Sequence, residues 1–459
     1  MAKIQPFPAR CLLAILCGGA YAFAYPPFGW RWLVFPALAG LLILLKGQHG
    51  TRARTLGFLF GMASFGVGLS WLYHIFGVLV VVLMCVLAAF PALFAEMQSR
   101  ATRYGMRGVQ LAIFTACNWG AWEFIRAELF PLRFPWMTPG LALGPTWLTP
   151  WVGVYGAGFV ILFALALAIH GHWKIAIVPV LVTWIPLSPL PALVRGDSGT
   201  HTVAGLQFEN VSLDVFLNET RKLPAEIDHV VWPEYAVPYD IRNNLRDWRL
   251  LRSLVGERNI TLTFGTQLHA GTGTKWRNTA LTLDPDGIRG EHTKVHTVHF
   301  FNDGTPGTTA VPVKTKHGMI GTPICFDCDY EDVVRRMTRA GAEMFVVPIM
   351  DAASWSARQH DQHAELFRMR ASENGRWMFV CGSSGTSQII DPHGHVHAKL
   401  PALAEGVMVG QIAAIRNQTF YTRAGWLLPW INLTTCAVWW TFLVFAKPQK
   451  HADRSFRGP

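Results

Sequence analysis

Long apolar segments recur through the first 190 residues, and they restrict the chain to folds that place helices in a bilayer. A helix needs about 20 mostly apolar residues to cross the hydrocarbon core of a membrane. Eight segments approach or reach this length: near 9–25, 31–46, 55–73, 75–95, 108–125, 150–170, 173–190 and 424–446. The composition agrees, because 51% of the 459 residues are hydrophobic and only 15% are charged. The sequence therefore predicts a bundle of eight transmembrane helices.

The basic residues predict how these helices are oriented. They fall in the loops that all lie on one side if the N-terminus is cytoplasmic: Lys3, Arg10, Lys46, Arg52, Arg54, Arg100, Arg103, Arg107, Lys174, Lys447, Lys450, Arg454 and Arg457. Cytoplasmic loops of membrane proteins carry such an excess of lysine and arginine. The first apolar segment is followed by Tyr25-Pro26-Pro27 rather than by a small-residue cleavage site, so we expect it to be retained. The net charge of +11 is then a topological signal, and a nucleic-acid partner is not expected.

A different pattern fills residues 197–420, where polar turns separate short strands. Strands are expected at 201–207, 228–234, 260–267, 279–283, 318–324, 343–348, 377–382, 388–390 and 407–412. Helices are expected at 241–256, 329–340 and 357–375. This mixture predicts a layered sheet sandwich flanked by helices. The domain prediction is therefore seven helices in 1–195, a catalytic domain in 196–420, an eighth helix in 421–447 and a cytoplasmic tail in 448–459.

Three residues at the ends of expected strands have side chains suited to nucleophilic catalysis. Glu234, Lys294 and Cys325 each end or follow a strand or hairpin. A cysteine at a strand-to-helix turn is exposed to backbone N–H groups that favour its thiolate. A nearby carboxylate serves as its base, and a lysine stabilises an oxyanion. Each residue alone is more often structural, and only their joint placement favours chemistry.

Two other groups of residues, a cysteine pair and a set of histidines, give weaker indications of function. Cys325 and Cys328 have the spacing of a redox pair, but no thioredoxin-like pattern surrounds them, and a disulfide there would disable the nucleophile. Three of the eight cysteines, the third being Cys381, fall in the polar part, which is too few for a disulfide framework. The histidines at 292, 296, 299, 360 and 363 do not form a recognisable ligand set. We expect no metal and no cofactor.

Residues 200–415 resemble the nitrilase (carbon-nitrogen hydrolase) superfamily. The resemblance rests on Trp232-Pro233-Glu234, His292-Thr293-Lys294 and Ile324-Cys325-Phe326-Asp327. The rest of the chain resembles the membrane branch of that superfamily, the apolipoprotein N-acyltransferases. Its motifs are matched at 23–29, 57–61, 68–73, 134–136, 153–156, 350–360 and 368–376. The resemblance implies an α-β-β-α sandwich with a Glu-Lys-Cys triad, joined to the helix bundle in the inner membrane and facing the periplasm.

The resemblance also implies a ping-pong acyl transfer. Glu234 would take the proton of Cys325, whose thiolate would attack an ester carbonyl of a phospholipid. Lys294 and the backbone N–H of Phe326 would hold the oxyanion. The acceptor would be the amine of a diacylglyceryl-cysteine at a lipoprotein N-terminus. Residues expected to contact substrate are Trp71, Trp136, Tyr155, Trp232 and Arg126, although the aromatic and arginine side chains near 123–136 also fit an interfacial belt.

The chain departs from the family pattern next to its lysine and its cysteine. Asn302 stands where a glutamate of the Pro-Phe-Gly-Glu block is expected, and Asp303 replaces that acid only if the register shifts by one. Phe326-Asp327 stands where the branch commonly has Tyr-Glu. These differences leave two alternatives open. One is a membrane-tethered amidase or thioesterase that passes the acyl group to water, and the other is a catalytically degenerate lipid- or lipoprotein-binding relative.

Overall fold

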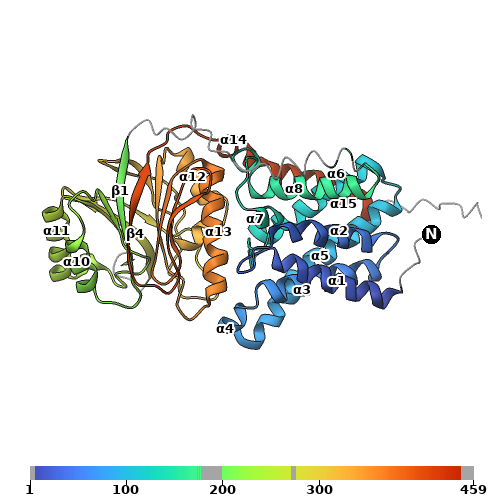
Figure 1. Ribbon diagram of the computed structural model, residues 1–459, viewed down its shortest axis with the longest axis horizontal. Coiled ribbons are helices and arrows are strands. Elements are labelled where there is room, and N and C mark those ends of the chain that lie inside the picture. The colour runs from blue at the N-terminus through green and yellow to red at the C-terminus, as the bar shows by residue number, and fades with distance from the viewer. Residues whose placement is uncertain (1–5, 173, 175, 177–198, 270–274, 446–459) are drawn as a thin grey trace, which may run out of the picture.

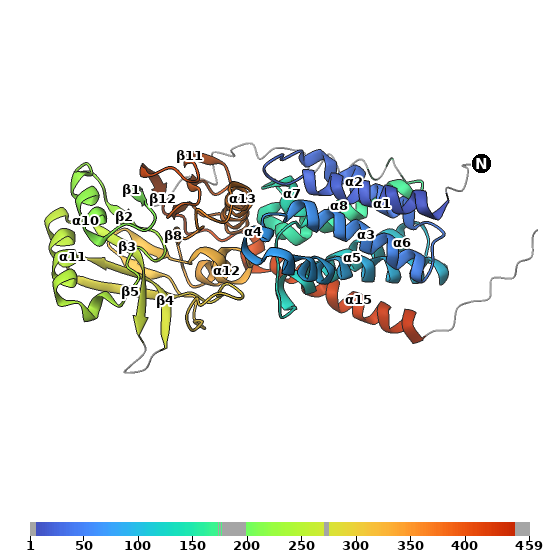
Figure 2. The ribbon, with the colours of Figure 1, turned by 90° about the horizontal axis from the view of Figure 1, so that it is seen from below.

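A computed structural model describes residues 6–172, 174, 176, 199–269 and 275–445. The helical N-terminal region and the sheet sandwich lie side by side along the longest axis of the molecule (Figure 1). The last helix, α15, returns to the helical region and runs along it (Figure 2). The bundle is therefore built from both ends of the chain, with the sandwich inserted between them.

The bundle consists of helices joined by short turns. Its members are α1 (Phe7–Phe23), α2 (Val34–Leu45), α3 (Thr51–Gly68), α4 (Leu72–Phe76), α5 (Val80–Arg103), α6 (Gly108–Phe124), α7 (Pro139–Leu143), α8 (Thr149–Ile169) and α15 (Leu428–Phe445). The helix α5 continues beyond the expected segment at 75–95 and ends with Arg100 and Arg103 in its last turn. Basic side chains interact favourably with the carbonyl end of a helix. The loop after α5 therefore begins about two turns later than the end of the expected segment at residue 95.

Glycines allow α3 and α5 to approach closely. A Cβ atom added at Gly57 would lie 2.3 Å from the carbonyl oxygen of Pro91, and one added at Gly61 would lie 2.8 Å from Cα of Ala88. Helices in a bilayer associate through such close packing because lipid supplies no hydrophobic drive between them. The Gly57–Gly61 spacing is thus a packing device of the bundle.

Three helices in the described part of the chain are long and apolar enough to cross a membrane, by length and composition: Leu72–Arg103, Thr149–Ile169 and Gly425–Phe445. Two shorter apolar helices span Phe7–Phe23 and Arg31–Leu45. The segment expected at 173–190 lies almost wholly outside the described residues, as does the tail at 448–459.

The sandwich contains two six-stranded sheets. The first has the order β12-β1-β2-β3-β4-β5 and the second β11-β10-β9-β8-β7-β6. The strands of the first sheet are β1 (Thr200–Gln207), β2 (His229–Val231), β3 (Thr261–His269), β4 (Trp276–Asp284), β5 (Gly287–Thr293) and β12 (Gly406–Ala413). Those of the second are β6 (Val313–Thr315), β7 (Gly318–Gly321), β8 (Met344–Ile349), β9 (Met378–Gly382), β10 (Ser387–Ile390) and β11 (Val396–Leu400). In each sheet three central strands are parallel: β1, β2 and β3, and β7, β8 and β9.

Helices cover the outer face of each sheet, which gives four layers. The helices α10 (Leu213–Lys222) and α11 (Leu245–Arg258) lie at the end far from the bundle, whereas α12 (Asp332–Arg339) and α13 (Ala357–Asn374) lie on the side facing it (Figure 1). Apolar cores fill the three spaces between layers, and the one between the sheets contains Val231, Val346 and Phe379. The C-terminal part therefore has the expected nitrilase-like α-β-β-α arrangement. Strands β5, β6 and β11 and helix α10 were not expected from the sequence.

Helix α13 is the main contact between sandwich and bundle. It begins at Ser356, whose side chain accepts a hydrogen bond from the backbone N–H of Gln359, and ends at Gly375 in a left-handed conformation. From this helix Gln362 donates to the carbonyls of Pro26 and Gly68 and accepts a bond from the indole N–H of Trp71. These bonds tie the sandwich to the ends of α1 and α3.

Candidate active site

Cys325 lies on the turn that follows β7. Its backbone has φ of +47°, a left-handed conformation that costs a side-chain-bearing residue free energy of order 1–3 kcal/mol. The short helix η5 (Cys325–Cys328) begins at the same residue. The thiol donates to the carbonyl of Met350 at 3.7 Å, just beyond β8. The turn therefore points the sulfur across the carboxyl ends of the parallel strands, where ligand sites of parallel sheets are commonly found.

Glu234 and Lys294 meet beside this turn. The carboxylate of Glu234 follows β2, and its Oε1 accepts hydrogen bonds from Nζ of Lys294 at 2.8 Å and from Asn278 at 2.6 Å. Its Oε2 accepts a bond from the backbone N–H of Met350 at 2.9 Å, so Met350 contacts both the carboxylate and the thiol. An added Cβ at Gly265 would lie 2.5 Å from Cα of Glu234, so a glycine is needed for this approach of β3. The structure thus brings the three predicted catalytic residues together.

Asp303, rather than Asn302, is the second acid of this cluster. Its Oδ2 lies 2.8 Å from Nζ of Lys294, and its Oδ1 accepts bonds from Asn278 at 2.8 Å and from the hydroxyl of Tyr235. The backbone N–H of Val298 also donates to Asp303 at 2.9 Å. Asn302 is exposed. The shift of one residue places a carboxylate on the lysine although the sequence motif lacks its glutamate.

One ammonium group shared by two carboxylates determines where a proton would bind. Burial raises the pKa of Glu234 above its ordinary value despite the opposing charge of Lys294. Burial also acts to raise the pKa of Asp303, but Lys294 and the hydrogen bonds to Tyr235 and Val298 hold it below its usual range. Burial lowers the pKa of Lys294, but the two carboxylates outweigh it and keep the lysine protonated. Glu234 is therefore the better proton acceptor of the two acids.

The thiol itself is protonated at rest. Burial and the carboxylate of Glu234 raise the pKa of Cys325 well above its ordinary value, and the charge of Lys294 only partly offsets them. A thiol in this environment needs a base to become a nucleophile. The raised pKa of Glu234 suits that task.

Asp327 has a positioning role in this structure. Its carboxylate accepts hydrogen bonds from the backbone N–H groups of Val295, His296 and Ile324, at 2.9, 2.8 and 3.1 Å. Its Oδ2 also lies 2.9 Å from Nε2 of His292. Asp327 thereby fixes the segment after Lys294 against the segment before Cys325. The side chain of its neighbour Phe326 lines the apolar pocket described below.

A buried histidine and two aspartates, none of them predicted from the sequence, lie next to the thiol. Nδ1 of His363 on α13 is 2.8 Å from Oδ1 of Asp351, and its Nε2 is 3.0 Å from Oδ1 of Asp329. The ligand atoms of Cys325, Asp351 and His363 all lie within 4.8 Å of one another. Burial lowers the pKa of His363, but the two carboxylates raise it to about 10. Since each ring nitrogen lies close to a carboxylate, the imidazolium form of His363 is favoured, and the ring orients Asp351 beside the sulfur.

Cys325 opens on one side into an apolar pocket of about 710 Å³. The bundle contributes Trp71, Leu72, Ile75, Phe76, Leu83, Leu132, Phe134 and Trp136, and the sandwich contributes Val298, Phe300, Phe301, Phe326 and Trp355. Trp136 is held in place because its indole N–H donates to Asp329 at 2.6 Å and its ring stacks on that of His363. We call this space the apolar pocket. Its lining includes both Cys325 and side chains of the helix bundle.

A second hollow also borders Cys325. It has a volume of about 970 Å³ and is lined by Glu234, Lys294, Asp303, Tyr235, Trp276 and Cys325, among others. The residues shared with the apolar pocket are Val298, Phe301, Cys325 and Trp355. We call this second space the polar cleft after the side chains of Glu234, Lys294 and Asp303 in its lining. Cys325 thus lines both spaces.

The predicted substrate-contacting residues separate into two groups. Trp71 and Trp136 line the apolar pocket. Trp232 is fully buried, stacks on Phe216 and donates to Thr220, so its side chain belongs to the core of the sandwich. The hydroxyl of Tyr155 donates to Glu128 at 2.6 Å inside the bundle.

Arg126 also lies away from both hollows. It is buried, sits in a π-helical turn (Ile125–Leu129), and donates to the carbonyls of Phe134 and Trp136. It therefore shapes the segment that carries Trp136 instead of lining the pocket. Because it is buried, it does not fit the interfacial-belt alternative as a snorkelling side chain.

The remaining constellations considered from the sequence have structural partners. Cys328 is fully buried in the core beneath η5, and all eight cysteines are free thiols. His292 faces Asp327, and His296 faces Asp332 at 2.6 Å. Nε2 of His360 lies 3.1 Å from the carbonyl of Ala352. Each of these rings has a contact that explains its position.

Comparison with known proteins assigns the two halves of the chain to families. Residues 17–167 match the family described as the apolipoprotein N-acyltransferase N-terminal domain, and residues 213–419 match the family described as carbon-nitrogen hydrolase. Proteins named apolipoprotein N-acyltransferase are similar over most of their length. The one from Geobacter metallireducens is 26% identical over 95% of this chain and 96% of its own. The one from Pseudomonas aeruginosa is 26% identical over 92% and 95%.

Solved structures of nitrilase-superfamily proteins match the sandwich portion. Saccharomyces cerevisiae Nit3, described as a member of branch 10 of the nitrilase superfamily, covers 48% of this chain and 92% of its own, with 20% identity and a TM-score of 0.42. The carbon-nitrogen hydrolase of Helicobacter pylori covers 54% and 99%, with 18% identity and a TM-score of 0.40. On the two domain matches and the near full-length relatives, this chain belongs to the apolipoprotein N-acyltransferase family of the carbon-nitrogen hydrolase superfamily.

Proposed function

We propose that this enzyme transfers an acyl chain from a phospholipid to the N-terminal amine of diacylglyceryl-cysteine lipoproteins. The observation that carries the proposal is the position of Cys325 between the apolar pocket and the polar cleft. An enzyme that hydrolyses small polar amides has no use for a pocket walled by Trp71, Leu72, Ile75 and Leu83 of a membrane-type bundle. A lipid acyl chain fits such a wall because apolar surface removed from water contributes about 25 cal/mol per Å².

In the first half-reaction Glu234 takes the proton of Cys325 and the thiolate attacks the ester carbonyl of the phospholipid. The ammonium of Lys294 has three N–H donors, of which Glu234 and Asp303 accept two. The third donor is free to stabilise the oxyanion, together with the backbone N–H of Phe326. The carbon–oxygen ester bond then breaks, and the leaving alkoxide of the lysophospholipid takes the proton from Glu234. A thioester remains on Cys325.

In the second half-reaction the lipoprotein amine attacks this thioester. The amine reaches the carbonyl carbon through the polar cleft while the acyl chain stays in the apolar pocket. Glu234 accepts a proton from the attacking nitrogen, the carbon–sulfur bond breaks, and the thiolate of Cys325 is protonated again. The products are an amide and the free enzyme. Acid, lysine and thiol are thereby returned to their starting states.

The basic residues of the helix bundle support an arrangement of the chain in the membrane. We infer eight spans in the inner membrane, the seventh near 173–190, with the sandwich on the periplasmic side and both termini cytoplasmic. Arg54 and Arg100 both pair with Glu96, at the N-terminal end of α3 and the C-terminal end of α5. The opposite end of α3 contacts the sandwich, because Arg358 donates to the carbonyl of Val67. Arg54 and Arg100 thus lie at the end of the bundle away from the catalytic domain, which supports a cytoplasmic position of that end under the positive-inside rule.

The test is a transfer assay with defined lipids. The purified protein is incubated in detergent with a phospholipid of known acyl composition and a synthetic peptide that begins with diacylglyceryl-cysteine. We expect mass spectrometry to find the peptide heavier by one acyl group attached through an amide. Release of free fatty acid with an unmodified peptide would instead support the amidase or thioesterase alternative. An unchanged lipid and peptide would support a non-catalytic relative.

The geometry at Lys294 argues against that last alternative. It was considered because Asn302 replaces the expected glutamate. Asp303 occupies the position beside the lysine instead, so the cluster retains two carboxylates.

A further inference from the structure

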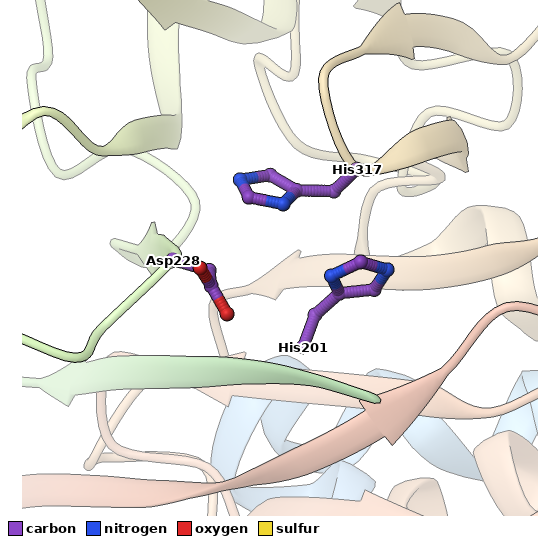
Figure 3. A group of neighbouring side chains, drawn as sticks. All are labelled: His201, Asp228 and His317. Atoms are coloured by element: carbon purple, nitrogen blue, oxygen red, sulfur yellow. The ribbon is translucent and has the colours of Figure 1, made fainter. Parts of the chain in front are cut away.

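Two histidines and an aspartate gather at the end of the sandwich opposite the catalytic cluster. His201 is in β1, Asp228 directly precedes β2, and His317 lies in the turn between β6 and β7. Their ligand atoms all lie within 4.8 Å of one another. Figure 3 shows the three side chains arranged around one space, each from a different segment of backbone.

One nitrogen on each imidazole ring of this group lacks a hydrogen-bond partner in the described part of the chain, although the ring of His317 also contacts the backbone of Asp228. Nε2 of His201 and Nε2 of His317 are both buried from solvent and have no hydrogen-bond partner among the residues that the structure describes. The two rings touch edge to face, with centroids 5.0 Å apart, but this contact leaves the nitrogen lone pairs unused. In Figure 3 the ring nitrogen of His201 that faces the shared space is Nδ1, whereas its Nε2 lies on the far side of the ring.

The carboxylate is held in a conformation suited to ligation. Oδ2 of Asp228 accepts a hydrogen bond from the backbone N–H of Thr202 at 2.9 Å. That bond fixes the side chain and leaves Oδ1 for another partner. The nearby cation Lys316 is directed elsewhere, since its Nζ donates to the carbonyl of Asn259 at 2.7 Å. The group therefore offers two imidazole nitrogens and one carboxylate oxygen to a common centre.

We propose that His201, Asp228 and His317 bind a divalent transition-metal ion, with zinc as the best match. Imidazole nitrogen and carboxylate oxygen are common zinc ligands at about 2.0–2.2 Å. Ligand atoms at that distance from a tetrahedral ion lie about 3.3–3.5 Å from one another. Side-chain movements of about an ångström therefore bring the three ligand atoms into position around an ion. Three protein ligands leave a fourth position for water. Softer or larger ions fit less well, because neither thiolates nor several carboxylates are present in the group.

The position of His201, Asp228 and His317 in the fold indicates a structural role for the ion. His201 and Asp228 belong to the first sheet and His317 to the second, so one ion would join the two sheets. Asp228 precedes β2, whose other end leads to Glu234, and His317 precedes β7, whose other end leads to Cys325. The ion would therefore fasten the starts of the two strands that present the catalytic acid and the nucleophile. We expect a structural site that stabilises the sandwich, independent of the acyl-transfer chemistry.

The sequence did not suggest this site. The three residues are separated by 27 and 89 positions, and no short motif connects them. Zinc sites are usually found from sequence by closely spaced pairs of ligands. Only the parallel register of β1 and β2 and the turn of the opposite sheet bring these ligands together.

The test uses the full chain purified in detergent, stripped with a chelator, exposed to zinc alone and then freed of unbound ion. We expect elemental analysis to find about one zinc per wild-type chain and zinc to raise Tm by roughly 5 °C. His201→Gln, His317→Gln and Asp228→Asn should each lose both effects. The stripped variants should elute and melt like the stripped wild type, which separates loss of ligation from loss of folding.

A matched control is the double variant His395→Gln, His397→Gln, which removes two histidines that also lie beside one aspartate, Asp391. We expect it to keep the zinc and the rise in Tm. The proposal is overturned if wild type keeps no zinc, if the three variants keep as much as wild type, or if only the control loses it. Should a variant fail to fold, replacement of zinc by cobalt in the wild type decides, since tetrahedral nitrogen and oxygen ligands give an intense visible spectrum and unbound cobalt does not.

Discussion

Oδ2 of Asp303 lies 2.8 Å from Nζ of Lys294, although Asp303 is one residue beyond the position where the family motif places an acid. The buried ammonium therefore has two carboxylate partners. This makes the identity of the second acid testable by a pair of neighbouring substitutions.

We expect Asp303→Asn to lower the rate of acyl transfer by about 100-fold, because Lys294 loses a charged partner that orients its remaining donor toward the oxyanion. Asn302→Asp should change the rate by no more than about twofold, since its side chain is exposed. Both rates are measured from the same phospholipid. A larger loss from Asn302→Asp than from Asp303→Asn would contradict the assignment.

His363 should make the stability of the protein depend on pH. Its pKa is raised to about 10 by Asp351 and Asp329, against an ordinary value near 6.5 in the unfolded chain. A group whose pKa is raised in the folded state stabilises the folded protein, and this stabilisation is complete when the pH is below the pKa of the unfolded chain. It is lost as the pH rises from about 6.5 to about 10. His363→Gln should therefore cost about 3–5 kcal/mol near pH 6 and clearly less near pH 10. Thermal unfolding at both pH values measures the difference.

The control for that experiment is His360→Gln, one turn earlier on the same helix and also fully buried. Its ring contacts the carbonyl of Ala352 instead of being enclosed by two carboxylates. We expect the loss of Tm to depend more strongly on pH for His363→Gln than for His360→Gln. If the two variants show the same pH dependence of Tm, the assignment of a buried imidazolium to His363 is wrong.

The apolar pocket should set the length of acyl chain that the enzyme accepts. Leu83 lines the pocket, whereas its neighbour Val82 is 64% exposed on the outside of the bundle. Leu83→Trp fills part of the pocket, and each methylene displaced from an apolar wall costs about 0.8 kcal/mol. We expect it to shift preference toward shorter acyl chains by about 10-fold or more, while Val82→Trp leaves it unchanged. Competition between phospholipids with long and short chains measures the ratio, and an equal shift in both variants would contradict the assigned pocket.

The sequence was most informative where function depends on the order of strands. Glu234 and Cys325 were recognisable because each follows an apolar strand, and carboxyl ends of parallel strands meet at one edge of a sheet. Lys294 was expected after a hairpin, and the structure has it directly after β5, a strand that the sequence pattern did not predict. The four-layer arrangement also followed from the pattern of strands and helices, together with the family resemblance.

The sequence was least informative where the chemistry depends on contacts between distant or irregular segments. Asp303 sits in a loop between β5 and β6, so no periodicity fixes which of two adjacent side chains turns inward. The His363–Asp329 pair joins α13 to the turn after η5, which no local pattern encodes. Trp232 was expected to contact substrate, but its packing against Phe216 places its side chain in the core.

The most direct measurement is the intact mass of the protein after incubation with phospholipid, for wild type, Cys325→Ala and Cys328→Ala. We predict that wild type and Cys328→Ala each gain the mass of one acyl group, which hydroxylamine removes, and that Cys325→Ala gains none. The two cysteines are three residues apart and both are buried, but only Cys325 lines the apolar pocket and the polar cleft, so the pair distinguishes the nucleophile from a neighbour that lines neither space. An adduct that persists in Cys325→Ala, or no adduct on the wild type with any phospholipid, would contradict a thioester on Cys325.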